Sequence, residues 1–158
     1  MVKNNYLYYA DDDYLFFMDN YNEGHVYNGM ASLAQNICEK YFKHLIDTYF
    51  EPKTEEEFTA QKGNLRTHNL KSLLKFIKGY MHIEIEPDFA AKIYAIDGFY
   101  FSMRYPGDDS DYATKDDIED CARAVTACRE FTYKMLDAFS QNDPSQAGKT
   151  MGSANEPV

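Results

Sequence analysis

The chain contains no tryptophan, few cysteines and no long apolar run. The scarcity of cysteine and the lack of a long apolar run each exclude a class of protein. Its cysteines, Cys38, Cys121 and Cys128, form no CxxC pair, so neither a disulfide framework nor a zinc site is expected. Cys121 and Cys128 share one face of a helical pattern, which is typical of buried cysteines. No stretch approaches membrane-spanning length, and the N-terminus has no signal-peptide core, so we expect a cytoplasmic protein.

Basic residues are also scarce, with 16 Lys and Arg against 26 Asp and Glu and a formal net charge of -10. This balance opposes non-specific attraction to phosphate backbones and to anionic membranes. Any recognition of a nucleotide or of RNA therefore requires a local pocket. The acidic runs at 11–13 and 108–109 are interpreted as solvated charge rather than as general acids or bases.

The spacings that identify common catalytic sites are missing. The sequence contains no HExxH, no Gly-rich phosphate loop, no GxSxG and no set of zinc ligands. From motifs alone we therefore predict no metal, no cofactor and no catalytic residue.

Tyrosine and phenylalanine are abundant, and they recur at helical spacing. The clearest stripe covers 30–50, where apolar residues follow an i, i+3, i+4, i+7 series. Similar stripes predict further helices at 5–21, 67–81, 87–103 and 114–139, with Thr67 as the N-cap of the third. A short helical turn is expected after Thr54, and the polar stretch 61–66 is expected to be a loop.

These stripes, joined by short links, predict an all-α fold: an up-and-down antiparallel bundle of about five helices. No alternating strand pattern is present. Residues 1–140 are expected to form the bundle. The segment 141–158 is rich in small and polar residues and is expected to be a disordered tail.

The candidate site for a phosphorylated ligand is a sparse set of basic and aromatic residues on one flank of the predicted helix 30–50, at the start of the third predicted helix and at the end of the fourth. The set is Lys40, Lys43, His44, His68, Arg104 and Tyr105. If these ends converge, Arg can bind phosphate with two hydrogen bonds and Lys as a point charge. A helix N-terminus beside Thr67 would add backbone N–H donors. The alternative is that His68 and Arg104 only fix helix ends through hydrogen bonds.

Three fragments resemble the HEPN family (higher eukaryotes and prokaryotes nucleotide-binding): LAQNICEKYFKHLI at 33–46, THNLKSLL at 67–74 and MRYPGD at 103–108. The likeness covers about 5–140. Carried over by position, the matched residues are Glu39, Lys40, Thr67, His68, Leu70, Arg104, Tyr105 and Pro106. Asn69 stands where the family usually has Asp.

The resemblance implies a helical bundle that often forms a homodimer, binds nucleotides or RNA, and pairs with a small nucleotidyltransferase in a toxin–antitoxin-like system. The ribonuclease branch carries a His four to six positions after an Arg, and no arginine of this chain has one. We therefore expect a non-catalytic binding module. The alternatives are a ribonuclease toxin, whose Arg and His come from different helices, and a ligand-free scaffolding dimer.

Overall fold

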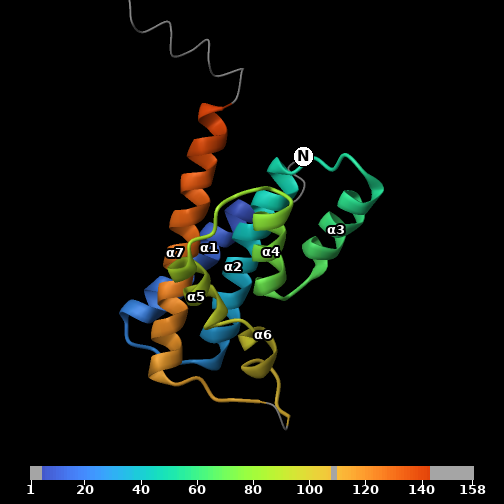
Figure 1. Cartoon of the computed structure of the whole chain (residues 1–158). Coiled ribbons are helices and arrows are strands. Elements are labelled where there is room, and N and C mark those ends of the chain that lie inside the picture. The colour runs from blue at the N-terminus through green and yellow to red at the C-terminus, as the bar shows by residue number, and fades with distance from the viewer. Residues whose placement is uncertain (1–4, 108–109, 143–158) are drawn as a thin grey trace, which may run out of the picture.

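A computed structural model describes residues 5–107 and 110–142, and that part of the chain is helical without any strand (Figure 1). The helices are α1 (Tyr6–Asn22), α2 (Asn28–Tyr49), α3 (Glu55–Arg66), α4 (Leu70–Gly79), α5 (Pro87–Tyr94), α6 (Phe99–Ser102) and α7 (Lys115–Gln141). The predicted all-α class is confirmed. The predicted tail lies outside the described residues from position 143 onward.

Helix α2 is the centre of the bundle. Twelve of its 22 residues are buried, and it packs against α1 and α7 on one side and against α3, α4 and α6 on the other (Figure 1). The three cysteines are buried and free, as their spacing predicted. Burial raises the pKa of Cys121 and Cys128, so both remain neutral thiols within the core.

Helix α3 occupies the stretch 61–66, where the sequence analysis wrongly placed a loop. Thr54 caps the helix by accepting a hydrogen bond from the Glu57 N–H at 3.1 Å. The buried Gln61 amide donates to the carbonyls of Ile46 and Phe50, both at 3.0 Å. Helix α3 is therefore attached to the C-terminal end of α2 by polar contacts. Because these contacts need no row of apolar residues, the sequence shows no apolar stripe here.

Helix α4 begins at Leu70, later than expected, and the predicted N-cap at Thr67 is wrong. The Asn69 side chain caps the helix by accepting from the Ser72 N–H at 2.8 Å. The Thr67 hydroxyl accepts from the Asn69 N–H at 3.1 Å and shapes the turn before the helix. The chain therefore reaches α4 in an extended conformation that brings His68 against α2.

The helix predicted at 87–103 is interrupted between α5 and α6. Gly98 adopts a φ of 100°, a left-handed conformation that favours glycine. Just before it, the Asp97 carboxylate accepts from the Leu70 N–H at 3.0 Å and the Lys71 N–H at 3.1 Å. The break therefore turns α6 towards α2 and attaches the α5–α6 connection to the start of α4.

The acidic run 11–13 on α1 was expected to be solvated charge, but this is true only of Asp12. Asp11 accepts hydrogen bonds from the hydroxyls of Tyr41, at 2.6 Å, and Tyr133. Asp13 pairs with Lys40 at 2.5 Å, and only Asp12 is exposed. Asp11 and Asp13 therefore attach α1 to α2 and α7. Residues 108–109, the other predicted acidic run, lie outside the described residues.

Candidate functional site

A row of buried polar side chains runs along the face of α2 that is turned towards α4 and α6. Gln35, Glu39 and Lys43 follow one another at intervals of four, and they are 0%, 2% and 7% exposed. Buried polar groups require partners, and these come both from one another along α2 and from residues outside it. Together with His68, Tyr100 and Arg104, the three residues form what we call the Glu39 cluster.

The Glu39 carboxylate is the acceptor at the centre of the cluster. It accepts from Gln35 Nε2 at 3.3 Å and from His68 Nδ1 at 3.1 Å, and Lys43 Nζ lies 3.7 Å away. Burial lowers the pKa of Lys43, and the negative charge of Glu39 opposes that shift. The carboxylate thus fixes the orientation of the His68 ring, with Nδ1 turned towards Glu39.

Gln35 attaches two distant segments to α2. Its Nε2 donates to the backbone carbonyl of His68 at 2.5 Å, and its Oε1 accepts from the backbone N–H of Tyr100 at 2.7 Å. The segment before α4 and the start of α6 are thereby held side by side. This contact places the two aromatic rings of the cluster against each other.

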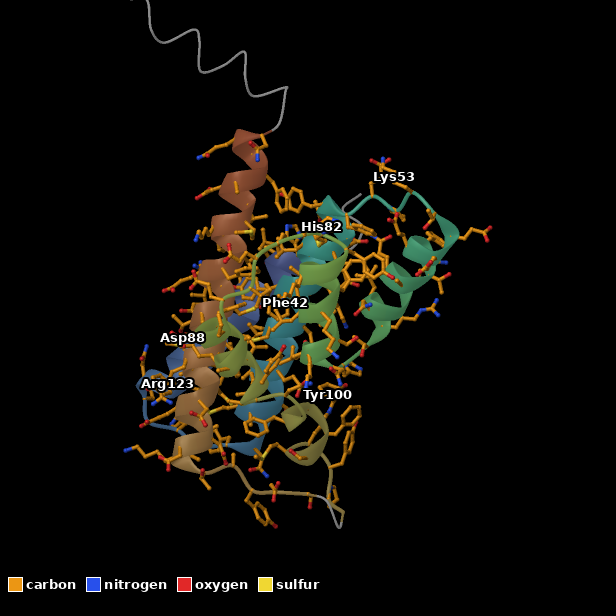
Figure 2. All side chains as sticks on the ribbon, viewed as in Figure 1. Phe42, Lys53, His82, Asp88, Tyr100 and Arg123 are labelled. Atoms are coloured by element: carbon orange, nitrogen blue, oxygen red, sulfur yellow. The ribbon has the colours of Figure 1, made fainter. Side chains whose placement is uncertain are left out.

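The exposed side of the cluster is an aromatic stack. The His68 ring lies parallel to the Tyr100 ring at 4.1 Å, and the Arg104 guanidinium lies 4.8 Å from the centre of Tyr100. Because His68 covers one face of Tyr100, the other face is left for Arg104. Figure 2 labels Tyr100 where α6 approaches the lower end of α4. Exposed aromatic rings of Phe101 and Tyr105 flank the stack.

Of the residues that the sequence analysis singled out, Lys43, His68, Arg104 and Tyr105 come together at this site. Lys40 and His44 lie elsewhere on α2. Lys40 pairs with Asp13 of α1 and lies 5.9 Å from the Tyr9 ring.

His44 Nδ1 lies 3.3 Å from the Thr48 hydroxyl, and its ring packs edge-on against Tyr49. Burial lowers the pKa of His44, and Asp47 and Asp11 oppose that shift. Lys40, although adjacent to Glu39 in sequence, therefore lies on a different side of α2 from the Glu39 cluster.

The expected anion site at the N-terminus of the third predicted helix is not open. The first N–H groups of α4 are bound by Asp97 and by the Asn69 side chain. Asp97 supplies a carboxylate at this helix end, where a negative charge interacts favourably with the helix dipole. The carboxylate of Asp97 therefore occupies the position that an external anion would take.

Gln35, Tyr100 and Asp97 were not among the residues predicted from the sequence. The interval of four from Gln35 to Glu39 to Lys43 was the available signal for a polar face on α2. Tyr100 precedes Arg104 by four positions, which was a weaker signal. Among the described residues, no group of three or more His, Cys, Asp or Glu could hold a metal ion, and no helix could cross a membrane.

The fold and the cluster define an all-helical protein with a buried carboxylate supporting an aromatic and basic surface. The family model of the HEPN domain matches residues 5–136. The chain therefore belongs to the HEPN domain family, as the three sequence fragments indicated. No curated protein and no solved structure matches it.

Proposed function

We propose that the chain is a non-catalytic binding module whose Glu39 cluster binds a nucleotide or another phosphorylated ligand. The observation that supports this most directly is the stack of His68, Tyr100 and Arg104. The exposed rings of Phe101 and Tyr105 beside this stack can stack on a nucleobase, and the Arg104 guanidinium can bind its phosphates. Such a site is local, which suits a chain with a net charge of -10.

The buried and exposed members of the cluster have different roles in this proposal. Lys43 is too deeply buried to reach a ligand, so it neutralises part of the charge on Glu39. Glu39 and Gln35 hold His68 and Tyr100 in place. Arg104 and Tyr105, both exposed, contact the ligand.

A ribonuclease is the second candidate function, and the pair Glu39–His68 favours it. A carboxylate that accepts from Nδ1 leaves Nε2 as a general base, as hydrolysis of a phosphodiester requires. The ring of Tyr100, however, contacts both His68 and Arg104 and occupies the space between them. A base and an arginine separated by a ring do not meet at one phosphate, so we favour binding without cleavage.

The binding proposal is tested by thermal unfolding with nucleoside mono-, di- and triphosphates. A ligand present at 100 times its Kd stabilises the folded state by about 2.7 kcal/mol, which raises the Tm measurably. We expect Arg104→Gln to reduce the shift by about half or more, because its affinity should fall at least about tenfold. The matched control is Arg123→Gln on α7, an exposed arginine far from Tyr100 in Figure 2, and it should preserve the shift. The absence of any shift at millimolar nucleotide would contradict the proposal.

The ribonuclease candidate is tested by incubating the purified protein with transfer and messenger RNA. We expect the RNA to remain intact. Cleavage that disappears in His68→Ala, with the variant folded by circular dichroism, would favour the enzyme over the binding module.

We also propose that the chain forms a homodimer through the groove between α7, α5 and the segment before α5. This groove has a volume of about 820 Å³. Its apolar lining includes Phe131, Met135 and Phe139, and its rim carries both acidic residues and the lysines Lys92 and Lys134. Charges of both signs allow a second copy to place opposite charges together.

The dimer is tested by light scattering after size-exclusion chromatography. Met135→Glu places a charge in the apolar part of the groove and should yield a monomer, whereas Leu15→Glu on α1 should leave the dimer intact. A wild-type monomer would contradict the proposal. A dimer that binds no nucleotide would support the scaffolding alternative. The pairing with a nucleotidyltransferase, which the family resemblance implies, stays a prediction.

A further inference from the structure

The outward side of α1 carries large apolar side chains where a surface helix normally carries polar ones. Tyr8, Tyr9, Leu15 and Phe16 are 63%, 59%, 60% and 62% exposed, while Ala10 and Phe17 on the inner side are fully buried. Large apolar side chains that gather on one exposed helix face often mark a binding surface. We call Tyr8, Tyr9, Asp12, Leu15, Phe16 and Asp19 the α1 outer stripe.

The members of the α1 outer stripe repeat at intervals of seven. Tyr8 precedes Leu15, Tyr9 precedes Phe16 and Asp12 precedes Asp19, each by seven positions. Residues seven apart lie almost directly in line along a helix, so these pairs form a strip along the axis of α1, with Asp12 and Asp19 between the apolar pairs. A strip that follows the helix axis suits a second helix lying alongside α1.

The charge of the stripe is of one sign. Asp12 and Asp19 are exposed, Glu23 follows the helix, and α1 contains no Lys or Arg. Lys40, which approaches α1 from α2, is bound by Asp13. Against a second copy, the carboxylates would face like charges, and an anionic membrane would be repelled for the same reason. A helix with flanking lysines or arginines would instead be attracted.

We propose that the α1 outer stripe docks a basic amphipathic helix of a partner protein, with apolar residues against Tyr8, Tyr9, Leu15 and Phe16 and basic residues beside Asp12 and Asp19. The stripe is separate from the Glu39 cluster, so this inference stands independently of nucleotide binding. It assigns α1 to partner recognition and leaves α6 and the start of α4 for the ligand.

The probe for this proposal is a synthetic helical peptide of three heptads, with Leu at the core positions and Lys at the flanking positions. A matched peptide carries Glu in place of every Lys. Binding to the full chain is followed by fluorescence anisotropy of the labelled peptide. We expect the Lys peptide to bind, with an affinity that falls as salt concentration rises, and the Glu peptide not to bind.

Two pairs of substitutions locate the binding surface. Leu15→Ser with Phe16→Ser should weaken binding of the Lys peptide by about tenfold or more, because both side chains lie at the centre of the stripe. Asp12→Asn with Asp19→Asn should weaken binding mainly at low salt. The matched control is Tyr112→Ser, which removes an exposed aromatic ring elsewhere and should leave binding unchanged. Circular dichroism melts establish that each variant is folded.

Several outcomes would overturn the proposal. Equal binding of the Glu peptide, or unchanged binding to the Leu15→Ser and Phe16→Ser variant, would remove its basis. A wild-type dimer that this variant converts to a monomer would identify a second copy as the occupant. Binding of phosphatidylserine vesicles that the same substitutions abolish would identify a membrane surface instead.

Discussion

Glu39 shows how one buried carboxylate can organise a site made from three segments. Its contacts with Gln35, Lys43 and His68 enclose a charge that is removed from water. Buried ion pairs of this kind often add little net stability, because desolvation offsets much of their attraction. We therefore interpret the cluster as a means of positioning His68 rather than as a main source of stability.

Removing one member of the Glu39 cluster should nevertheless lower the stability of the folded protein. We predict that Glu39→Ala lowers the free energy of unfolding by about 3 kcal/mol, because it leaves the Lys43 ammonium buried without a partner. Denaturant unfolding followed by circular dichroism measures this change. The double variant Glu39→Met with Lys43→Met should recover most of the loss, and a fully stable Glu39→Ala variant would contradict the account.

The tyrosines that donate to Asp11 predict a loss of stability at alkaline pH. Burial, followed by the contact with Asp11, raises the pKa of Tyr41 and Tyr133 above the ordinary value of 10.0. The unfolded chain therefore loses these protons first, above pH 10, while the folded chain keeps them. Their contribution to stability is present below pH 10 and is lost as pH rises through the raised pKa values.

Tyr41→Phe separates this effect from other titrations. It should lower stability at pH 7 by about 1.5 kcal/mol, because a hydrogen bond to a charged group is lost. Above pH 10 its stability should fall less steeply than that of the wild type. Thermal melts of both proteins from pH 7 to pH 11 measure the difference, and parallel curves above pH 10 would be inconsistent with it.

The individual residues of the site were only partly predictable from sequence. Lys43, His68 and Arg104 could be identified because they are basic side chains, the first beside the apolar stripe of the predicted helix 30–50 and the other two at predicted helix ends. Tyr100 and Asp97 could not, because their contacts join positions 65 and 27 residues apart. No local pattern encodes such contacts, which depend on how the helices pack.

At the scale of elements, the helices with apolar stripes and strong caps were predictable, and the others were not. Thr114, the predicted start of the last helix, is the N-cap of α7, where it forms a capping box with Asp117. Helix α3 buries only Gln61, so it has no stripe to detect. The interruption between α5 and α6 escaped detection because apolar residues continue through it at helical spacing.

Substituting two glycines by alanine should change the stability of the protein in opposite directions. Gly98 has a positive φ, so Gly98→Ala should destabilise the protein by about 1 kcal/mol although no atom lies in the way of a Cβ. Gly63 lies inside α3 with open space beside it, so Gly63→Ala should stabilise by about 0.5 kcal/mol. Denaturant unfolding of both variants measures these changes. The same sign for both would contradict the assigned backbone conformations.

The carboxylate of Asp97 should act as a cap for α4. We predict that Asp97→Ala lowers the free energy of unfolding by about 1 kcal/mol, because the N–H groups of Leu70 and Lys71 lose their acceptor. Asp12→Asn, at an exposed position of α1, serves as the control and should have little effect. Chemical denaturation compares the three proteins, and equal stability of all three would argue against the cap.

At the scale of the whole molecule, α2 separates two surfaces. One side carries the Glu39 cluster towards α4 and α6, and the other joins α1 and α7 through Asp11 and Asp13 (Figure 1). The bundle itself was predictable, because apolar periodicity determines which faces are buried. The division of charged residues between the two sides was not, since Glu39 and Lys40 are adjacent in sequence but point to different neighbours.

The central claim is that the stack of His68, Tyr100 and Arg104 binds a phosphorylated ligand. Isothermal titration calorimetry, with the nucleotide that most raises the Tm, tests it most directly. We predict a single binding site whose Kd is at least about tenfold higher in Arg104→Gln, and unchanged in Arg123→Gln. Equal affinity in all three proteins would place the ligand elsewhere and contradict the account.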